Sequence, residues 1–312
     1  MIPQYNCGLD PEYLVTDRDS GFIIPAAVFL PTGDKKASVA YDNAAVELRP
    51  LPSTDIGRLL RNTHPLIAQA ELERVKSGIK ALPNLSPAGM IDLPYRNEPS
   101  ISSFGCSPSW VLDRSGQLVK SVPLVGPDSP YRTAGFHVHV DTGLKWDSEN
   151  DALEYNAPFV ATIDALVGLV DVIVCNKMHW RLASRLRRTR IGYGLAGEFR
   201  LRSGYSIFEY RTMSPWPLGS YKWSEWVTIA IRSIMQAPRE AVVRFSSETP
   251  RSAVVDSINN CEMTARAIWL QALARWSNIV YTNDVKSRAV VVLSDTLAVP
   301  QLAGAQWNEV VQ

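Results

Sequence analysis

Four strand-like segments of the chain carry acidic, histidine or arginine residues, most of them two positions apart. The segments are Asp10-Pro-Glu12, the run that holds Asp42 and Glu47, His137-Val-His139 and Glu209-Tyr-Arg211. Side chains two residues apart on a β-strand point to the same face. Several such strands in one sheet would therefore give that sheet a polar face on which the side chains converge.

The N-terminal third is predicted to be an antiparallel sheet followed by a helix. Strand patterns run over residues 7–15, 22–30 and 39–48, and the polar residues at 32–35 suit a hairpin connection. A helical pattern begins after a cap at 53–55. Pro65 is expected to kink or split that helix.

The remainder is predicted to mix short strands with helices. Residues 83–132 are rich in proline and glycine, which indicates loops and short strands and is interpreted as an insertion. A strand at 134–140, a helix at 152–188 and a hairpin of strands 198–201 and 206–212 follow. Helices are predicted from residue 220 onward. The fold class is α+β, with one catalytic domain over 1–312, an insertion at about 83–132 and a helical C-terminal part at about 220–312.

Composition limits the partners and the compartment. With 32 Lys+Arg against 31 Asp+Glu, no global charge favours a nucleic acid or a membrane. The most apolar stretch, 158–174, contains two aspartates and is predicted to be a buried helix. The four cysteines are widely spaced and no signal-peptide pattern precedes them, so we expect reduced thiols without disulfides and a cytoplasmic location.

The residue types at these positions favour a phosphate-bound cation. Mg²⁺ and Mn²⁺ take oxygen ligands with an occasional imidazole, and they often bridge to substrate phosphates. Arginines cluster between 181 and 211. Arg181, Arg185 and Arg188 have the spacing of a solvent-exposed helix face. The better phosphate-binding candidates are Arg190, Arg200 and Arg211, beside predicted strands and the turn Gly192-Tyr-Gly194.

Each segment taken alone also has a purely structural explanation. The first acidic pair fits a solvent-facing edge strand, the histidines fit ordinary core or surface positions, and Glu209 with Arg211 fits an ion pair. The chain has no GxxxxGK[ST] or GxSxG motif, which disfavours P-loop and serine-hydrolase enzymes. Phosphate binding would then depend on side chains of a sheet.

Six segments, in this order, resemble motifs of the phage-encoded COOH-NH2 ligases (amidoligases) of type 2, in the glutamine-synthetase-like superfamily. They are CGLDPEY at 7–13, YDNAAVELRP at 41–50, FGCSPS at 104–109, AGFHVHV at 134–140, RIGYGLAGEFR at 190–200 and FEYR at 208–211. The chain departs from the pattern with Asp10, where glutamine synthetases commonly have glutamate, and with Ile191-Gly192 before the Tyr-Gly pair. The resemblance implies a glutamine-synthetase/glutamate-cysteine-ligase-like curved antiparallel sheet with helices on its outer face.

The resemblance also implies an activity. An ATP- and Mg²⁺-dependent (or Mn²⁺-dependent) ligase would join a small-molecule or peptide carboxylate to an amine through an acyl phosphate. It implies metal binding by Asp10, Glu12, Glu47, His137 and Glu209, and nucleotide binding by Arg190, Arg200, Arg211 and His139. Glu209 and Arg211 would serve catalysis, with Asp42 as the candidate base.

Two other functions remain open from the sequence. One is a non-catalytic phage structural or host-interaction protein on the same fold, and the other is a phosphotransfer enzyme of the guanidino-kinase-like type. A homo-oligomer is possible, and a phage-encoded protein would act in the host cytoplasm.

Overall fold

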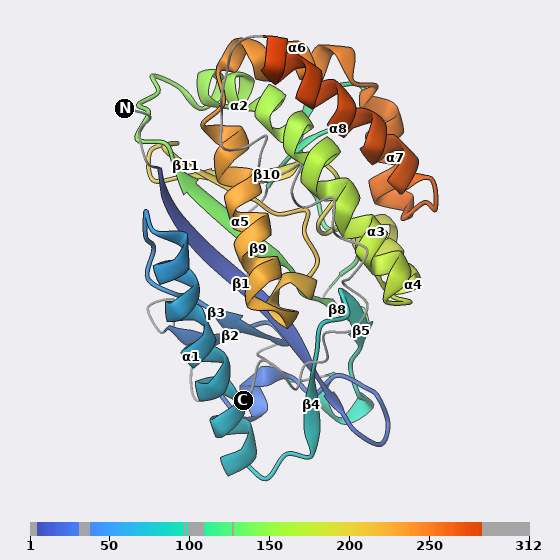
Figure 1. Ribbon diagram of the computed structural model, residues 1–312. Coiled ribbons are helices and arrows are strands. Elements are labelled where there is room, and N and C mark those ends of the chain that lie inside the picture. Colours follow the sequence, from blue (N-terminus) through green and yellow to red (C-terminus); the bar gives the residue numbers. More distant parts are fainter. Residues whose placement is uncertain (1–4, 31–37, 97, 99–108, 127, 283–312) are drawn as a thin grey trace.

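The computed structural model describes residues 5–30, 38–96, 98, 109–126 and 128–282, which build one large antiparallel sheet with helices packed against it (Figure 1). The spatial strand order is β2-β3-β1-β9-β11-β10-β6-β7, and β4 also pairs with β1. The α+β class is confirmed. The strands are β1 (Asn6–Asp17), β2 (Val39–Asp42), β3 (Ala45–Leu48), β4 (Ala81–Asn84), β6 (Trp110–Leu112), β7 (Leu118–Lys120), β9 (Phe136–Asp141), β10 (Glu198–Arg202) and β11 (Ile207–Tyr210).

Alternation along the central strands separates an apolar face of the sheet from a polar one. Phe136, Val138 and Val140 of β9 are fully buried in the hydrophobic core. The two histidines between them therefore point to the opposite side. The sequence pattern with period two thus fixes which face of β9 meets the core.

The strand register then aligns the polar residues of neighbouring strands. Glu12 lies opposite Glu47, and Asp10 lies opposite His137. Further along the sheet, Glu209 lies between His139 on one side and Arg200 on the other. Directly opposed residues share a face. The register thus joins the polar positions of five strands, β3, β1, β9, β11 and β10, into one surface.

Helices cover the apolar face. The helices α1 (Ile56–Lys76) and α5 (Tyr221–Met235) lie over the strands in Figure 1, and both contact the sheet. Asp55 caps α1, because its carboxylate accepts the N–H of Arg58 at 3.1 Å. The described residues from 221 to 282 are mainly helical, and the rest of the helical part predicted at about 220–312 lies outside the described residues. A second group of helices comprises α2 (Glu149–Ile163), α3 (Leu169–Lys177), α6 (Arg239–Glu248), α7 (Arg251–Asn260) and α8 (Ala265–Thr282).

The most apolar helical stretch is a core element. Among the described residues, Glu149–Lys177 is the one helical stretch long and apolar enough to cross a membrane. Of its apolar 18-residue part, 83% is buried inside the protein. Its two buried aspartates are paired: Asp164 accepts from Tyr210 and Arg251, and Asp171 forms an ion pair with Arg188. The predicted buried helix is therefore confirmed.

Two predicted elements in the N-terminal third are wrong. Residues 22–30 form a 3-10 turn, η1 (Ala26–Val28), with an isolated bridge at Ile23 in place of a strand. Pro25 lacks the N–H that a sheet ladder requires. Residues 39–48 form the hairpin β2–β3, which turns through Asn43 at a φ of 55°. The connection predicted at 32–35 lies outside the described residues.

The other differences concern helix ends. Pro65 lies inside a continuous α1 and does not split it. The helix predicted over 152–188 ends at Lys177, and a turn with His179 at a φ of 59° precedes α4 (Arg181–Leu186). The hairpin around Gly204 is confirmed, with Gly204 at a φ of 65°.

The segment 83–132 contributes short strands, as predicted. The strands β6 and β7 extend the main sheet, and β5 (Ala88–Met90) pairs with β8 (Tyr131–Thr133) in a separate two-stranded sheet. The division of the chain into one domain with an insertion stays a prediction. Cys7, Cys175 and Cys261 are buried free thiols, as expected, and Cys106 lies outside the described residues.

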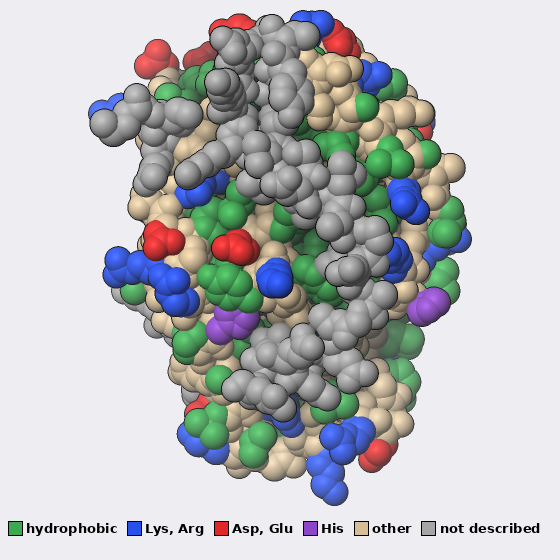
Figure 2. Space-filling model, viewed as in Figure 1, with side chains coloured by type: hydrophobic (Ala, Val, Ile, Leu, Met, Phe, Trp, Pro, Cys, Tyr) green, Lys and Arg blue, Asp and Glu red, His purple; other side chains and the backbone are tan. Residues whose placement is uncertain are grey.

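Acidic and basic side chains are interspersed over the described surface that Figure 2 shows. This distribution agrees with the net charge of +1.

Candidate functional site

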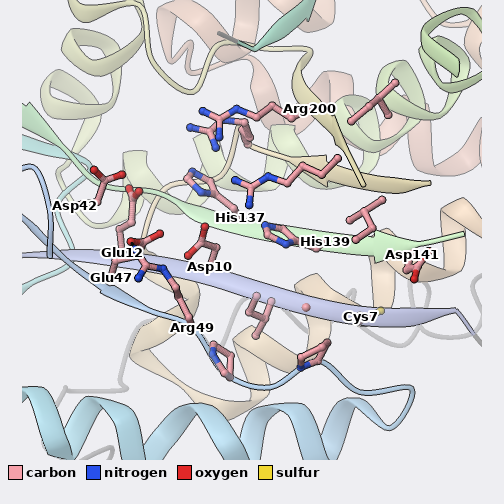
Figure 3. A pocket seen from close by; sticks show the side chains of 18 of the residues that line it. Cys7, Asp10, Glu12, Asp42, Glu47, Arg49, His137, His139, Asp141 and Arg200 are labelled. Carbon is pink, nitrogen blue, oxygen red and sulfur yellow. Dashed lines mark hydrogen bonds and ion pairs between the residues drawn. The ribbon is translucent and has the colours of Figure 1, made fainter. Parts of the chain in front are cut away.

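A cavity of about 590 Å³ lies against the polar side chains of the sheet (Figure 3). Glu209 lies beside it, fully buried, and Arg190 is exposed and outside the lining residues. The structure thus brings together residues more than 190 positions apart in the chain. The predicted site residues that line the cavity are Asp10, Glu12, Asp42, Glu47, His137, His139, Arg200 and Arg211.

The carboxylates gather at one end of the cavity. Figure 3 shows Asp42, Glu12, Glu47 and Asp10 close together, next to Arg49. Glu47 forms an ion pair with Arg49. The backbone N–H of Gly135 donates to Glu12 Oε2 at 2.9 Å.

Burial makes two of these carboxylates, Glu12 and Asp10, unusually basic. It raises the pKa of Glu12 to about 8, and the nearby charge of Asp42 raises that pKa further. Burial also raises the pKa of Asp10. Asp10 Oδ1 is buried and has no hydrogen-bond partner among the described residues. A cation next to these oxygens would stabilise their ionised forms.

Glu209 is the anionic centre of the other end. It pairs with Arg211, with Arg202 (Nε to Oε2, 2.6 Å) and more distantly with Arg200 (Nη1 to Oε1, 3.9 Å). Burial alone would raise the pKa of Glu209, but Arg211 and the neighbouring histidines and Arg202 hold it well below the usual range. Its role as a metal ligand stays a prediction, since its ion-pair partners include three arginines.

Arg200 and the two histidines offer polar atoms to a ligand. Arg200 Nε and Nη2, His137 Nδ1 and His139 Nε2 are buried and have no hydrogen-bond partner in the described part of the chain. Burial lowers the pKa of both histidines, and Arg211 lowers that of His137 further. Both imidazoles are therefore neutral near pH 7, whereas Arg200 carries a positive charge with open donors. Unsatisfied buried donors are costly, so this arrangement favours an anionic ligand.

The carboxylates of the cavity fit Mg²⁺ only together with a bound ligand that supplies further oxygen atoms. No group of three or more His, Cys, Asp or Glu side chains within the described ranges is arranged to hold a metal ion by itself. Mg²⁺ is usually bound through one or two carboxylates together with waters and substrate phosphates. The open oxygen of Asp10 beside Glu12 and Glu47 suits that mode.

The arginines between 181 and 211 are distributed between the surface and the interior differently from the prediction. Arg181 and Arg185 are exposed, as expected for a solvated face. Arg188 is fully buried and pairs with Asp171 at 2.5 Å, so its assignment to that face is wrong. Arg187 is also buried and donates to the backbone carbonyls of residues 211–213. Both arginines are buried because they have carboxylate or carbonyl partners inside the protein. The local spacing of the arginines in the sequence does not reveal these partners.

Sequence patterns missed Tyr193, whose hydroxyl lies between the carboxylates and the arginines. It is 2.9 Å from His137 Nε2, 3.3 Å from Glu12 Oε2 and 3.2 Å from Arg211 Nη2. Arg202, also missed, follows Arg200 by two positions, so the period of the strand already placed it on the same face.

Gly194 holds the loop that carries Tyr193. Its φ is 66°, and an added Cβ would overlap the guanidinium of Arg187. We therefore expect Gly194→Ala to lower the free energy of unfolding by about 2–4 kcal/mol, from backbone strain and overpacking together. Urea denaturation measures the loss.

Gly204→Ala is the matched control for that substitution. Gly204 has nearly the same φ, 65°, but no atom of the described residues lies within 4 Å of an added Cβ. Gly204→Ala should lower the free energy of unfolding by only about 1 kcal/mol. Equal losses in the two variants would show that Arg187 does not constrain the loop.

Comparisons with known proteins give little to set beside this geometry. No protein-family model and no curated protein matches the chain. Among solved structures, it is similar to the crystal structure of a bifunctional glutathione synthetase from Pasteurella multocida, with 12% identity and a TM-score of 0.40. The alignment covers 99% of this chain and 51% of that chain, so the chain spans about half of its length. A likeness of this degree carries no argument about function.

Proposed function

We propose that the protein is an ATP- and Mg²⁺-dependent ligase that joins a carboxylate to an amine through an acyl phosphate. The observation that carries the proposal is a single cavity in which buried carboxylates lie near a guanidinium with open donors. Asp10 offers an oxygen there, and Arg200 two nitrogens, that have no hydrogen-bond partner among the residues that the structure describes. A metal-bound polyphosphate needs both kinds of group at once.

The chain's own residues would divide the binding of the nucleotide. Asp10, Glu12 and Glu47 would hold Mg²⁺, with His137 and Glu209 as further candidates. Arg200, Arg211 and His139 would bind phosphate oxygens, and Arg202 is added to this set because it lines the cavity. Mg²⁺ would supply neutralisation of the charge on the phosphates. Arg190 is not among the residues that would bind phosphate oxygens, because it is exposed and does not line the cavity.

The reaction takes place in two balanced steps. A carboxylate oxygen attacks the γ-phosphorus of ATP and ADP leaves, which gives an acyl phosphate. The amine then attacks the carbonyl carbon, phosphate leaves and the nitrogen loses a proton. The arginines stabilise charge on the transferred group. Asp42, which lines the cavity, is the candidate acceptor of that proton.

Arg200→Gln tests the nucleotide site. We expect MgATP to stabilise the folded parent by mass action and so to raise its melting temperature. The gain in the free energy of unfolding is about 2.7 kcal/mol at a ligand concentration of 100 Kd. Arg200→Gln should remove most of this stabilisation. Arg190→Gln is the matched control, because it removes an exposed arginine outside the cavity lining and should leave the shift unchanged.

ADP release, screened over amino acids, peptides and other carboxylates with and without amines, tests the reaction. A ligase releases ADP only when both a carboxylate and an amine are present, and it yields an amide. ADP release with another acceptor would identify a different phosphotransfer enzyme. No Mg²⁺-dependent shift with ATP would favour a non-catalytic interaction protein. A cytoplasmic location and a homo-oligomer stay predictions.

A further inference from the structure

The strand β1 carries a glycine on the polar face of the sheet, within its pairing with β9. Gly8 lies directly opposite His139 and lines the cavity, between Asn6 and Asp10 on the same face. A glycine inside a strand weakens that strand, because it loses much conformational freedom on folding and contributes no side chain to packing. The position of Gly8 therefore needs a physical reason.

The described residues supply none of the usual structural reasons for this glycine. The pairing of β1 with β9 runs without interruption over residues 6–11, so no bulge lies at Gly8. Gly8 is not among the glycines at positive φ. An added Cβ would lie 3.5 Å from the Cβ of His139, which is ordinary van der Waals contact, and its three nearest atoms belong to that side chain and not to another backbone. The reason that remains is the close approach of a ligand from the cavity.

The strand register places Gly8 in a row with groups that can bind a ligand. His139 lies opposite Gly8, Glu209 lies opposite His139, and Arg200 lies opposite Glu209. His139 Nε2 and two nitrogens of Arg200 are buried and have no hydrogen-bond partner in the described part of the chain. The backbone at Gly8 thus forms an open floor beside these groups.

Along β1 the polar face changes from acidic to neutral at Gly8. The face carries carboxylates at Glu12 and Asp10, whereas Gly8 and Asn6 are uncharged, and all four residues line the cavity. Under the proposed function, the metal and the phosphates lie between these carboxylates and Arg200. An uncharged part of the ligand therefore fits the cavity at Gly8 and Asn6.

Hydrogen-bonding groups lie just beyond Gly8. Asn6 lies opposite Asp141, one row further along the strands, and both line the cavity. Figure 3 shows Asp141 at the end of the cavity away from Asp42. Asp141 Oδ1 accepts the N–H of Gly143 at 3.0 Å, and no described residue donates a hydrogen bond to Oδ2. A carboxylate and an amide can both accept hydrogen bonds from hydroxyl groups.

We propose that Gly8 makes room for the sugar of the bound nucleotide, and that Asn6 and Asp141 bind the sugar hydroxyls. This inference rests on the proposed function, which puts the triphosphate next to Asp10 and Arg200. The sugar is the uncharged, hydroxyl-bearing group attached directly to the phosphates, and the row of Gly8 directly follows that of Asp10. Carboxylates accept hydrogen bonds from ribose hydroxyls in dinucleotide-binding enzymes as well. A side chain at position 8 would take the space of the sugar.

Gly8→Ala and Gly8→Val test this role by calorimetry with two ligands. Magnesium tripolyphosphate has the phosphates of MgATP but no sugar. We expect Gly8→Val to weaken MgATP binding by about 10- to 100-fold, the scale of overpacking a filled site, and Gly8→Ala to weaken it less. Both variants should bind magnesium tripolyphosphate as the parent does. The melting temperature of Gly8→Ala should not fall, because the added methyl meets no obstacle and alanine loses less freedom on folding.

Gly126→Ala is the matched control. Gly126 lies outside the cavity lining, has no positive φ, and has no atom of the described residues within 4 Å of an added Cβ. It should leave both affinities unchanged. MgATP affinities of the Gly8 variants equal to the parent's would overturn the inference alone. Equal losses for MgATP and tripolyphosphate would overturn it too, because a phosphate would then lie over Gly8.

A second measurement needs no change at Gly8. We expect the parent to bind the magnesium complex of 2′,3′-dideoxy-ATP about 10-fold more weakly than MgATP, because Asp141 loses the hydroxyls that it binds. In Asp141→Ala the two nucleotides should bind alike. Equal affinities of the two nucleotides for the parent would overturn the sugar assignment. Parent protein that binds neither MgATP nor magnesium tripolyphosphate would refute the proposed function, and this inference with it.

Discussion

Arg211→Ala is expected to lower the free energy of unfolding by about 3–5 kcal/mol, the cost of leaving a buried charge without its partner. Arg211 is 1% exposed, and its guanidinium pairs with two carboxylates, Glu209 and Glu198. Glu209 is itself fully buried, so truncation would leave it with Arg202 and the more distant Arg200. Urea or thermal denaturation measures the loss.

Arg181→Ala is the control for that substitution. Arg181 is exposed and its Nε donates one hydrogen bond to the carbonyl of Cys261 at 3.0 Å. Its loss should cost no more than about 1 kcal/mol. If the two variants were equally stable, the carboxylate pairs of Arg211 would contribute nothing to the fold.

The same two arginines differ in their expected effect on ligand binding. Arg211 lines the cavity and Arg181 does not. MgATP affinity should therefore fall in an Arg211→Lys variant, which keeps the positive charge but loses the planar fork, and should not fall in Arg181→Ala. Equal affinities by calorimetry would remove Arg211 from the nucleotide site.

Glu12→Gln and Glu209→Gln are expected to change stability with opposite dependence on pH. The pKa of Glu12 is raised from 4.5 to about 8 in the folded protein, mainly by burial. Its contribution to stability is fully present below pH 4.5 and is lost as pH rises toward 8. At 1.36 kcal/mol per pKa unit the loss is of the order of 5 kcal/mol. Glu12→Gln should therefore gain stability relative to the parent between about pH 5 and 8.

The contribution of Glu209 to stability depends on pH in the opposite direction. Its arginine partners lower its folded pKa below the usual 4.5, so the charged form contributes stability that is present above pH 4.5 and is lost at more acid pH. Glu209→Gln should be much less stable than the parent at neutral pH, with a difference that shrinks below about pH 4.5. The physical reason is that three arginines lose their charged partner in this variant.

Denaturation curves of the parent and both glutamine variants from pH 3 to 9 measure these effects. Parallel profiles for the two variants would contradict the opposite environments of the two carboxylates. ATP turnover gives an independent readout, since Glu209→Gln should lose nearly all activity if the arginines act on the phosphates. Turnover equal to the parent's would remove Glu209 from the active site.

The sequence by itself determined the polar face of the sheet. Asp10 with Glu12, and His137 with His139, stand two residues apart, and the geometry of an extended backbone puts such pairs on one side whatever the fold. Apolar residues between them, such as Val138, marked the opposite face as core. Local covalent geometry suffices for this assignment of faces, and strand register then brings most of these residues to one cavity.

Only the tertiary structure decided which charges meet. Arg187 and Arg188 are buried and Arg190 is exposed, although all three lie in one short basic run. Tyr193 reaches Glu12 across 181 positions of sequence. Strand order and register select such partners, and burial then sets their pKa values, because desolvation and Coulomb energy depend on distances that no local pattern contains.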